Sequence, residues 1–425
     1  MKTNMKRWFI LALGTAVMFF AGIIYAWSIL KAPLQEEFSW SASQLALNFT
    51  LTMCMFCIGG IISGALLPKV SLKLILGAAG ILACVGFVIA SGVGAYGIGA
   101  SGVGASGVGA SGIGSSGSGA EGLARLYLSY GILGGLGIGI GYNAIISVVN
   151  EWFPDKKGTS SGILMMSFGA SALIFGNMAN SMISSPIGWR TTFRILGVLI
   201  GASLVLAAVF IRHPSEEERR PENAAVPGTA TSRRNYTPTE MIKRPAFIRF
   251  FLFLILACAV GNSTISMARD VAISVGAPAG LAALLAGVLS LCNGGGRLLA
   301  GMLFDRCGQR ITMIADGIIT MIAPAVMLLA IYSHSVAVCA VGLCLTGLSY
   351  SFQPPVTSSV VASFYGTEHF SINYSITNLM MIPASFAATI DGVLYTSTGS
   401  YFAPFALLMV FSVISFILNL SIRHG

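Results

Sequence analysis

Long apolar stretches separated by short polar segments dominate the pattern of this chain. Each stretch is about 20 residues long, which is the length that an α-helix needs to cross a bilayer. The pattern therefore predicts an all-α, polytopic membrane protein with twelve transmembrane helices. We expect these helices at residues 8–30, 44–67, 71–91, 123–150, 159–184, 191–212, 246–268, 279–303, 311–332, 335–363, 370–394 and 401–422.

A short loop signature occurs twice between these apolar stretches. The well-kept copy lies in the second half and consists of Gly301, Asp305, Arg306, Gly308 and Arg310. Residues 64–73 of the first half hold a glycine and basic residues in the same register. Internal repeats of this kind are typical of secondary transporters. The repeat predicts two pseudo-symmetric six-helix bundles, at residues 1–212 and 246–425, joined by a cytosolic linker at 213–245.

Residues 92–119 differ from the rest of the first half, because Ser-Gly-Val/Ile-Gly-Ala/Ser recurs there with a five-residue period. Glycine in such numbers leaves much backbone entropy and few side chains for packing. We therefore expect a mobile, Gly-rich outer loop without a ligand site.

Composition and charge agree with a membrane protein. The chain has 55% hydrophobic residues, 9% charged residues and a mean hydropathy of +0.83, against roughly 25% charged residues in a soluble domain. Lys and Arg gather in the loops of one side, which the positive-inside rule identifies as cytosolic. This predicts a multi-pass protein of the plasma membrane with both termini in the cytosol. The net charge of +9 reflects that topology and not nucleic-acid binding.

The residues that could carry enzymatic or metal chemistry are poorly placed. Cys54 and Cys57 form a C-x-x-C inside an apolar stretch, without histidine or acidic neighbours, which favours buried thiols over metal or redox chemistry. The four histidines lie at the ends of predicted helices. We expect neither an enzyme nor a metal site, and no cofactor.

One arginine lies inside a predicted transmembrane helix. Arg297 is eight residues before Asp305, a distance of about 12 Å along a helix. An arginine at the helix centre costs about 2.5–3.5 kcal/mol on insertion scales, so something must compensate it. It is either a structural cation bonded to carbonyls or to Asp305, or a group that binds an anion, since guanidinium grips carboxylates in a bidentate fashion and keeps its charge.

Polar and aromatic residues on several predicted helices could line a cavity around this arginine. Together they suggest a small substrate site with one fixed positive charge. The candidate substrate-binding residues are Arg297, Tyr142, Asn293, Tyr25, Tyr350, Gln353 and Asn378.

Acidic residues are placed differently. Glu151, Asp316 and Asp391 lie towards the ends of predicted helices, whereas a carrier that relays protons through its own carboxylates is expected to hold one deeper. This favours exchange of anions over proton symport. It also disfavours a multidrug-type carrier of neutral or cationic solutes, for which an acid at the site is expected.

Several further motifs carry a resemblance to a known family. The loop signature resembles that of the major facilitator superfamily, and other stretches look like its oxalate/formate antiporter branch, which is related to the monocarboxylate carriers. These stretches are residues 25–28 with Pro33, 40–41, 137–142, 152–158 with 161–162, 188–190 with Phe193, and 293–297.

The resemblance implies two bundles that rock about a central site. It also implies that Arg297 of the eighth helix and Tyr142 of the fourth bind the substrate. The lysine expected on the eleventh helix is missing, with Met381 or a neighbour in its place. One cation in place of two implies a substrate of lower charge, so a monocarboxylate is expected rather than the oxalate dianion.

The resemblance and the residues together predict an alternating-access carrier of small organic anions. It is expected to work as a monomer in the lipid bilayer and by exchange, with proton-coupled symport as the alternative. The loop signature is expected to act as a conformational lock, which closes the inner face in the outward-open state through contacts with helix ends. Its members are Gly301, Asp305, Arg306, Gly308 and Arg310.

Overall fold

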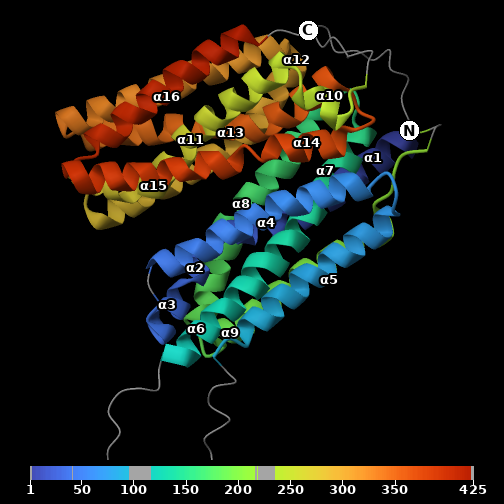
Figure 1. The fold of residues 1–425 in the computed structure, drawn as a ribbon, viewed down its shortest axis with the longest axis horizontal. Helices are drawn as coiled ribbons and strands as arrows, with labels where there is room; N and C mark the ends of the chain where they lie inside the picture. Colours follow the sequence, from blue (N-terminus) through green and yellow to red (C-terminus); the bar gives the residue numbers. More distant parts are fainter. Residues whose placement is uncertain (1, 41, 95–115, 216–217, 219–234, 423–425) are drawn as a thin grey trace, which may run out of the picture. The chain divides into compact units, whose positions relative to one another are not determined.

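The computed structural model describes the chain except for residues 1, 41, 95–115, 216–217, 219–234 and 423–425. In this described part, helices are the regular elements that occur (Figure 1). Most of the predicted outer loop at 92–119 and of the predicted linker at 213–245 lies outside the described residues. The mobility expected of that loop therefore stays a prediction.

The helices of the first half cover most of the described residues before 213. Their bounds are α1 (Lys2–Ala21), η1 (Gly22–Ala26), α2 (Trp27–Leu30), α3 (Ala32–Phe38), α4 (Ala42–Leu66), α5 (Leu72–Ser91), α6 (Ser116–Leu126), η2 (Tyr127–Gly134), α7 (Gly135–Trp152), α8 (Lys157–Ile183) and α9 (Gly188–Phe210).

The second half begins with a short helix inside the predicted linker. The bounds are α10 (Pro238–Ile242), α11 (Pro245–Ser274), α12 (Ala279–Ser333), α13 (Val336–Tyr365), α14 (Phe370–Asn378), α15 (Met381–Thr398) and α16 (Phe402–Ser421).

Eleven helical stretches of the described chain are long and apolar enough to cross a membrane. One of them, Gly280–Ser333, has 54 residues, about twice the length that one crossing needs. It bends at Gly308, whose φ of 78° and ψ of 174° are not helical, and only glycine adopts such a backbone readily. The two helices that meet at Gly308 complete the twelve predicted spans, and the all-α membrane fold is confirmed.

Three predicted helices are less regular than the hydrophobic pattern suggested. The first breaks into α1, η1 and α2, and the fourth begins already at Ser116 and contains the π-helical segment η2. The eleventh is divided into α14 and α15. Pro383 explains this last break, because its ring lacks an N–H and collides with the carbonyl of residue 379 in a continuous helix.

The described chain forms two compact units that do not follow the two halves of the sequence. The first unit contains residues 1–11, 146–170 and 213–425, and the second contains residues 12–145 and 171–212. In the first unit, α11 packs against α13, α15 and α16, and α12 packs against α13 and α16. The predicted division into bundles at 1–212 and 246–425 stays a prediction.

The glycine-rich start of α7 brings helices of the second unit close together. A Cβ atom added to Gly137 would lie 2.5 Å from the backbone nitrogen of Ala83 in α5, and one added to Gly135 would lie 2.7 Å from the carbonyl oxygen of Thr52 in α4. These positions therefore tolerate no side chain. Close helix packing through small residues is common in membranes, and it accounts for this glycine run.

The Gly188-Trp189-Arg190 motif ties the start of α9 to α3. Arg190 and Trp189 both donate hydrogen bonds to the carboxylate of Glu37, at 2.6 Å and 2.7 Å. Partial burial acts to raise the pKa of Glu37, but the hydrogen bonds from Arg190 and Trp189 outweigh it, and the pKa is lowered. This motif therefore links α9 to α3 within the second unit and has a structural role.

Candidate functional site

Arg297 is buried in the first unit without a neutralising carboxylate. Arg297 is only 5% exposed, and its Nη1 donates a hydrogen bond to the carbonyl oxygen of Met165 in α8 at 2.8 Å. Its Nε is buried and has no hydrogen-bond partner. Among the residues that the structure describes, no Asp or Glu pairs with it. The guanidinium is thus a buried cation with donors to spare.

The purely structural alternative for Arg297 required bonds to carbonyls or to Asp305. One carbonyl bond is present, but the Asp305 carboxylate is used elsewhere. Asn293, one helical turn before Arg297 on α12, also has a buried Oδ1 without a partner. Buried polar atoms without partners are rare in proteins and call for a ligand or water. The face of α12 that carries these two residues is therefore the strongest candidate for a substrate site.

Asp305 contacts the first turn of α8. Its Oδ1 accepts a hydrogen bond from the backbone N–H of Gly158 at 2.9 Å, and its Oδ2 accepts from the N–H and the hydroxyl of Thr159, at 2.7 Å and 2.5 Å. A carboxylate is favourable at a helix N-terminus because it satisfies free N–H groups and the helix dipole. Beside it, a Cβ on Gly158 would lie 2.5 Å from the carbonyl oxygen of Gly301.

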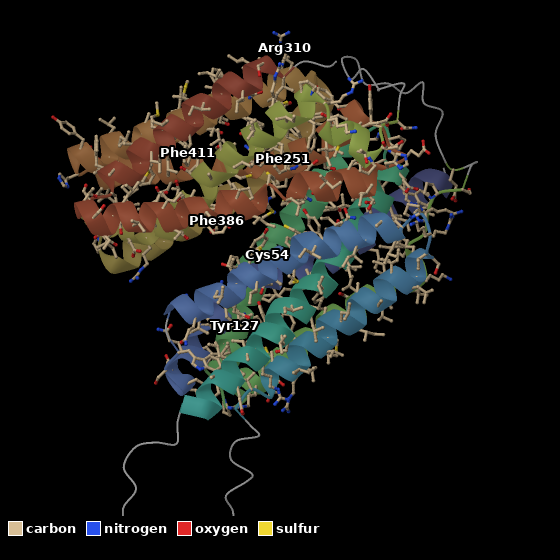
Figure 2. All side chains as sticks on the ribbon, viewed as in Figure 1. Cys54, Tyr127, Phe251, Arg310, Phe386 and Phe411 are labelled. Carbon is tan, nitrogen blue, oxygen red and sulfur yellow. The ribbon has the colours of Figure 1, made fainter. Side chains whose placement is uncertain are left out.

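The other members of the loop signature act differently from the expectation. Gly308 supplies the bend of α12. Arg306 and Arg310 are exposed, and Arg310 points away from the ribbon (Figure 2). In the described part of the chain neither forms an ion pair. The contact with a helix end, which was expected of all three charged residues, is therefore made by Asp305 alone.

A buried polar network joins α7, α8 and α13 near this contact. The amide of Asn150 donates to the hydroxyl of Ser358 at 3.1 Å, and its Oδ1 accepts from Ser160 at 3.1 Å and from Ser161 at 3.0 Å. The hydroxyls of Ser161 and Ser358 are 3.0 Å apart. The polarity of these residues in apolar helices was the available sequence signal for this network.

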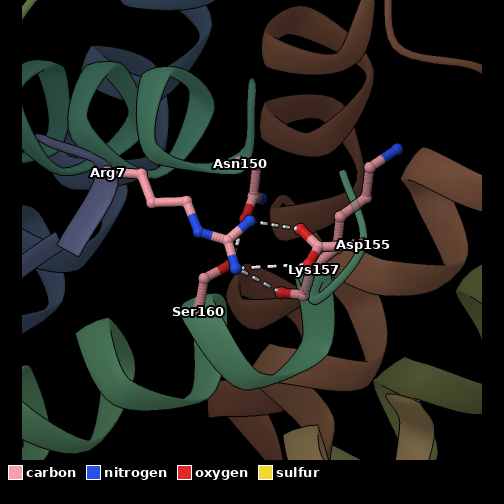
Figure 3. A network of polar contacts seen from close by, with 5 residues as sticks. All are labelled: Arg7, Asn150, Asp155, Lys157 and Ser160. Atoms are coloured by element: carbon pink, nitrogen blue, oxygen red, sulfur yellow. Dashed lines mark hydrogen bonds and ion pairs between the residues drawn. The ribbon is translucent and has the colours of Figure 1, made fainter. Parts of the chain in front are cut away.

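Arg7 fixes the loop that leads into α8. Its Nη1 and Nη2 donate to the two carboxylate oxygens of Asp155, at 2.9 Å and 3.3 Å, and Figure 3 shows this fork together with Asn150 and Ser160. The guanidinium also lies 4.7 Å from the centre of the Phe153 ring. Bidentate pairs of this kind fix geometry as well as charge. The pair thereby positions the first turn of α8, which binds Asp305.

Three other predicted site residues lie in the same unit. Gln353 of α13 is 1% exposed, and its amide donates to the carboxylate of Asp316 at 2.8 Å, while its Oε1 is buried without a partner. Tyr350 is 9% exposed and packs directly on Gly261 of α11. Asn378 is the last residue of α14, at the break before α15, and is half-buried.

The two predicted tyrosines of the first sequence half belong to the second unit. Tyr25 is half-buried in the short helix η1. Tyr142 of α7 is 9% exposed, with its ring centre 5.0 Å from that of Phe56. Their participation in one site with Arg297 stays a prediction.

Two carboxylates, those of Asp316 and Asp391, are buried inside the protein. Asp316 is 0% exposed and also accepts a hydrogen bond from Thr320 at 3.2 Å. Asp391 of α15 is 2% exposed and accepts a hydrogen bond from Ser263 of α11. Both were expected towards helix ends, and their burial inside the protein was not predicted. Matching polar residues on neighbouring helices, such as Gln353, were the available signal.

The described residues provide no metal site, because no three His, Cys, Asp or Glu side chains among them come close enough to hold an ion. All eight cysteines are free thiols, and Cys307 is the exposed one. Chemically, an unpartnered guanidinium N–H such as the Nε of Arg297 can donate a hydrogen bond to an anion.

Comparison with known proteins gives the family. A sequence profile described as Major Facilitator Superfamily matches residues 11–268, more than half of the chain. The chain belongs to the Major Facilitator Superfamily. Membership places it among membrane transporters and not among enzymes.

Relatives of this superfamily member agree with the resemblance found in its motifs. An uncharacterized MFS-type transporter of Escherichia coli (strain K12) is 26% identical, over 87% of this chain and 83% of its own. The oxalate:formate antiporter of Oxalobacter formigenes is 22% identical, over 87% and 80%. Monocarboxylate transporter 12 of Mus musculus is 25% identical, over 91% and 79%.

A solved structure supports the fold of the superfamily. The fucose:proton symporter of E. coli matches 98% of this chain and 98% of its own, with a TM-score of 0.68 and 16% identity. At that identity the likeness concerns the fold alone. It agrees with the twelve-helix architecture of an MFS transporter.

The Asp305 contact yields a testable prediction. Asp305→Asn removes the charge at the start of α8, which is worth about 1 kcal/mol, so the ratio of conformers should shift about fivefold towards separation of α8 from α12. Spin labels on Cys307 and on Lys156→Cys, in a chain without the other cysteines, report this distance.

The control for this measurement is Asp270→Asn, since Asp270 is exposed on α11. It should leave the distance distribution unchanged. An unchanged distribution in Asp305→Asn as well would rule out a locking role for this contact.

Proposed function

We propose that this MFS protein transports small organic anions by alternating access, with monocarboxylates as its preferred substrates. The observation that carries the proposal is the Arg297 guanidinium, which is 5% exposed, permanently charged and without an acidic partner in the described chain.

The energetics of that guanidinium favour an anion as the substrate. A cation inside the membrane is costly, and a bound carboxylate neutralises it while accepting two parallel hydrogen bonds from the planar fork. A neutral or cationic solute leaves the charge uncompensated. Binding free energy is therefore available for anions and not for the solutes of a multidrug-type carrier.

The charge count supports a monocarboxylate. The broken eleventh helix has methionine at positions 380 and 381, and Met380 is 2% exposed with its sulfur 3.5 Å from that of Cys258. No second cation comes from this segment. The names of relatives agree with carboxylates as the class, since one is an oxalate:formate antiporter and another a monocarboxylate transporter.

Exchange follows from the same charge. After release of one anion, an empty carrier would return through its occluded state with Arg297 unneutralised. A second anion removes that cost, so return is faster when a counter-substrate is bound. The Asp305 contact and the Asn150 network would hold closed the face that is predicted to be cytosolic. The protein itself is proposed to be a multi-pass protein of the plasma membrane with both termini in the cytosol.

The test of the proposal is uptake of radiolabelled formate, acetate, lactate, pyruvate and oxalate into proteoliposomes. Arg297→Gln should abolish the uptake that the wild type shows, because the amide binds no anion as an ion pair. Arg269→Gln, at an exposed position of α11, is the matched control and should transport normally. Uptake by Arg297→Gln at the wild-type rate, or none by the wild type, would contradict the proposal.

Proton-coupled symport is the second candidate mode, and Asp316 is the observation that favours it. Its carboxylate is fully buried, and the groups that bond to it, Gln353 and Thr320, are neutral. Thr320 is in turn 2.5 Å from the hydroxyl of Ser349. Both hydroxyls can reverse their direction of donation. This series of hydrogen bonds can therefore accommodate a carboxylate that gains and loses a proton.

A proton gradient separates the two modes. In symport, an inward proton gradient should accelerate uptake into vesicles without internal anion, and Asp316→Asn should remove that acceleration. Asp270→Asn, at an exposed site, should retain it. In exchange, internal anion accelerates uptake and the gradient does not, and Asp316→Asn behaves as the wild type.

A further inference from the structure

Helix α8 meets α12 along one face that carries glycine at three positions. Gly158, Gly162 and Gly169 share this face with Met165, at the spacing that aligns side chains along a helix. A Cβ on Gly162 would lie 2.7 Å from the carbonyl oxygen of Arg297, and one on Gly169 would lie 3.1 Å from its Nη1 and 3.3 Å from its Cζ.

Gly169 leaves room for the guanidinium on the backbone of α8. The carbonyl oxygen of Met165 accepts the N–H of residue 169 within the helix, and its second lone pair accepts Nη1 of Arg297 at 2.8 Å. A side chain at residue 169 would crowd the guanidinium on this carbonyl and push it by a few tenths of an ångström. Met165 itself is 0% exposed, so this contact between the guanidinium and α8 lies in a packed interior.

The bond to Met165 uses one part of the guanidinium and leaves one edge open. Nε and Nη2 form an edge whose N–H groups are parallel, and in the described chain neither of them donates a hydrogen bond. A carboxylate binds such an edge with both oxygens. The carbonyl of Met165 thus fixes the plane of the guanidinium without occupying the edge that an anion needs.

The same two helices carry the Asp305 contact. On α12, Asp305 follows Arg297 by eight residues, and on α8 the Asp305 partner Gly158 precedes Met165 by seven. These separations are about 12 Å and 10 Å along a helix. When α8 leaves Asp305, the Met165 carbonyl and Gly169 move away from Arg297 as well.

We infer that Gly169 and the Met165 carbonyl are the positioning elements of the anion site, which hold the Arg297 guanidinium with its Nε–Nη2 edge towards the substrate. This inference rests on the proposed function. Because both elements lie on α8, separation of α8 from α12 frees the guanidinium to reorient and lowers the affinity for the anion. Affinity that differs between two states is what drives a conformational cycle.

The test compares Gly169→Ala with the control Gly295→Ala. Gly295 lies on the same helix as Arg297, but a Cβ there would meet no atom within 4 Å. Formate, acetate, lactate, pyruvate and oxalate are titrated onto the purified proteins in nanodiscs. Gly169→Ala should bind the anion about 10-fold more weakly, the equivalent of one misaligned charge-assisted hydrogen bond. In transport, its KM should rise while its maximal rate stays near that of the wild type. Gly295→Ala should match the wild type in both.

A double-mutant cycle separates a positioning role from a general packing defect. In an Arg297→Gln background no guanidinium lies beside residue 169, so Gly169→Ala should then change the melting temperature less than it does in the wild type. An equal change in both backgrounds would overturn the inference.

The remaining outcomes separate this inference from the proposed function. If the wild type binds an anion, Arg297→Gln does not, and Gly169→Ala binds as tightly as the wild type, the positioning role is wrong and the anion site stands. If Arg297→Gln binds as tightly as the wild type, or if the wild type binds none of the five anions, the proposed function fails and the inference fails with it.

Discussion

The buried, unneutralised charge of Arg297 is the constraint on which this account depends. Its cost in an apolar environment requires compensation, and the structure provides one carbonyl, from Met165, in place of a carboxylate. In the proposed function, an anionic substrate completes that compensation. The proposed substrate class, single-charge preference and advantage of exchange over empty return all rest on this one group.

The contact between α8 and α12 places that charge beside the helix that is proposed to move between states. At one end Asp305 caps the first turn of α8, and further along the same helices Arg297 lies on Met165. Gly158, in contact with Gly301, allows the backbones to approach, and Arg7 holds the preceding loop through Asp155. In the proposed mechanism, binding and closure therefore share one helix pair.

The sequence predicted the parts of this arrangement that depend on residue type and spacing along the chain. The helical spans, the interruption between the spans at 279–303 and 311–332 and the isolated arginine could all be found from hydropathy and from the loop signature. The bond to the Met165 carbonyl could not be predicted, because every residue has a backbone carbonyl and the sequence does not distinguish one from another. The burial of Asp316 was missed for a similar reason. Position along a helix does not say which neighbour, here Gln353, covers a side chain. Arg306 and Arg310 take no part in the Asp305 contact. This too depends on how the helix is rotated about its axis.

The most direct test of the central claim compares equilibrium binding of each carboxylate with that of the amide of the same size, such as acetate with acetamide and lactate with lactamide. Shape and size are nearly matched in each pair, whereas the negative charge and the second acceptor oxygen belong to the carboxylate alone. If Arg297 recognises the substrate, the purified protein should bind the carboxylate about 100-fold more tightly than the amide, in keeping with the strength of a charged bidentate pair. Equal affinity for the two would show that the charge of Arg297 does not select the substrate.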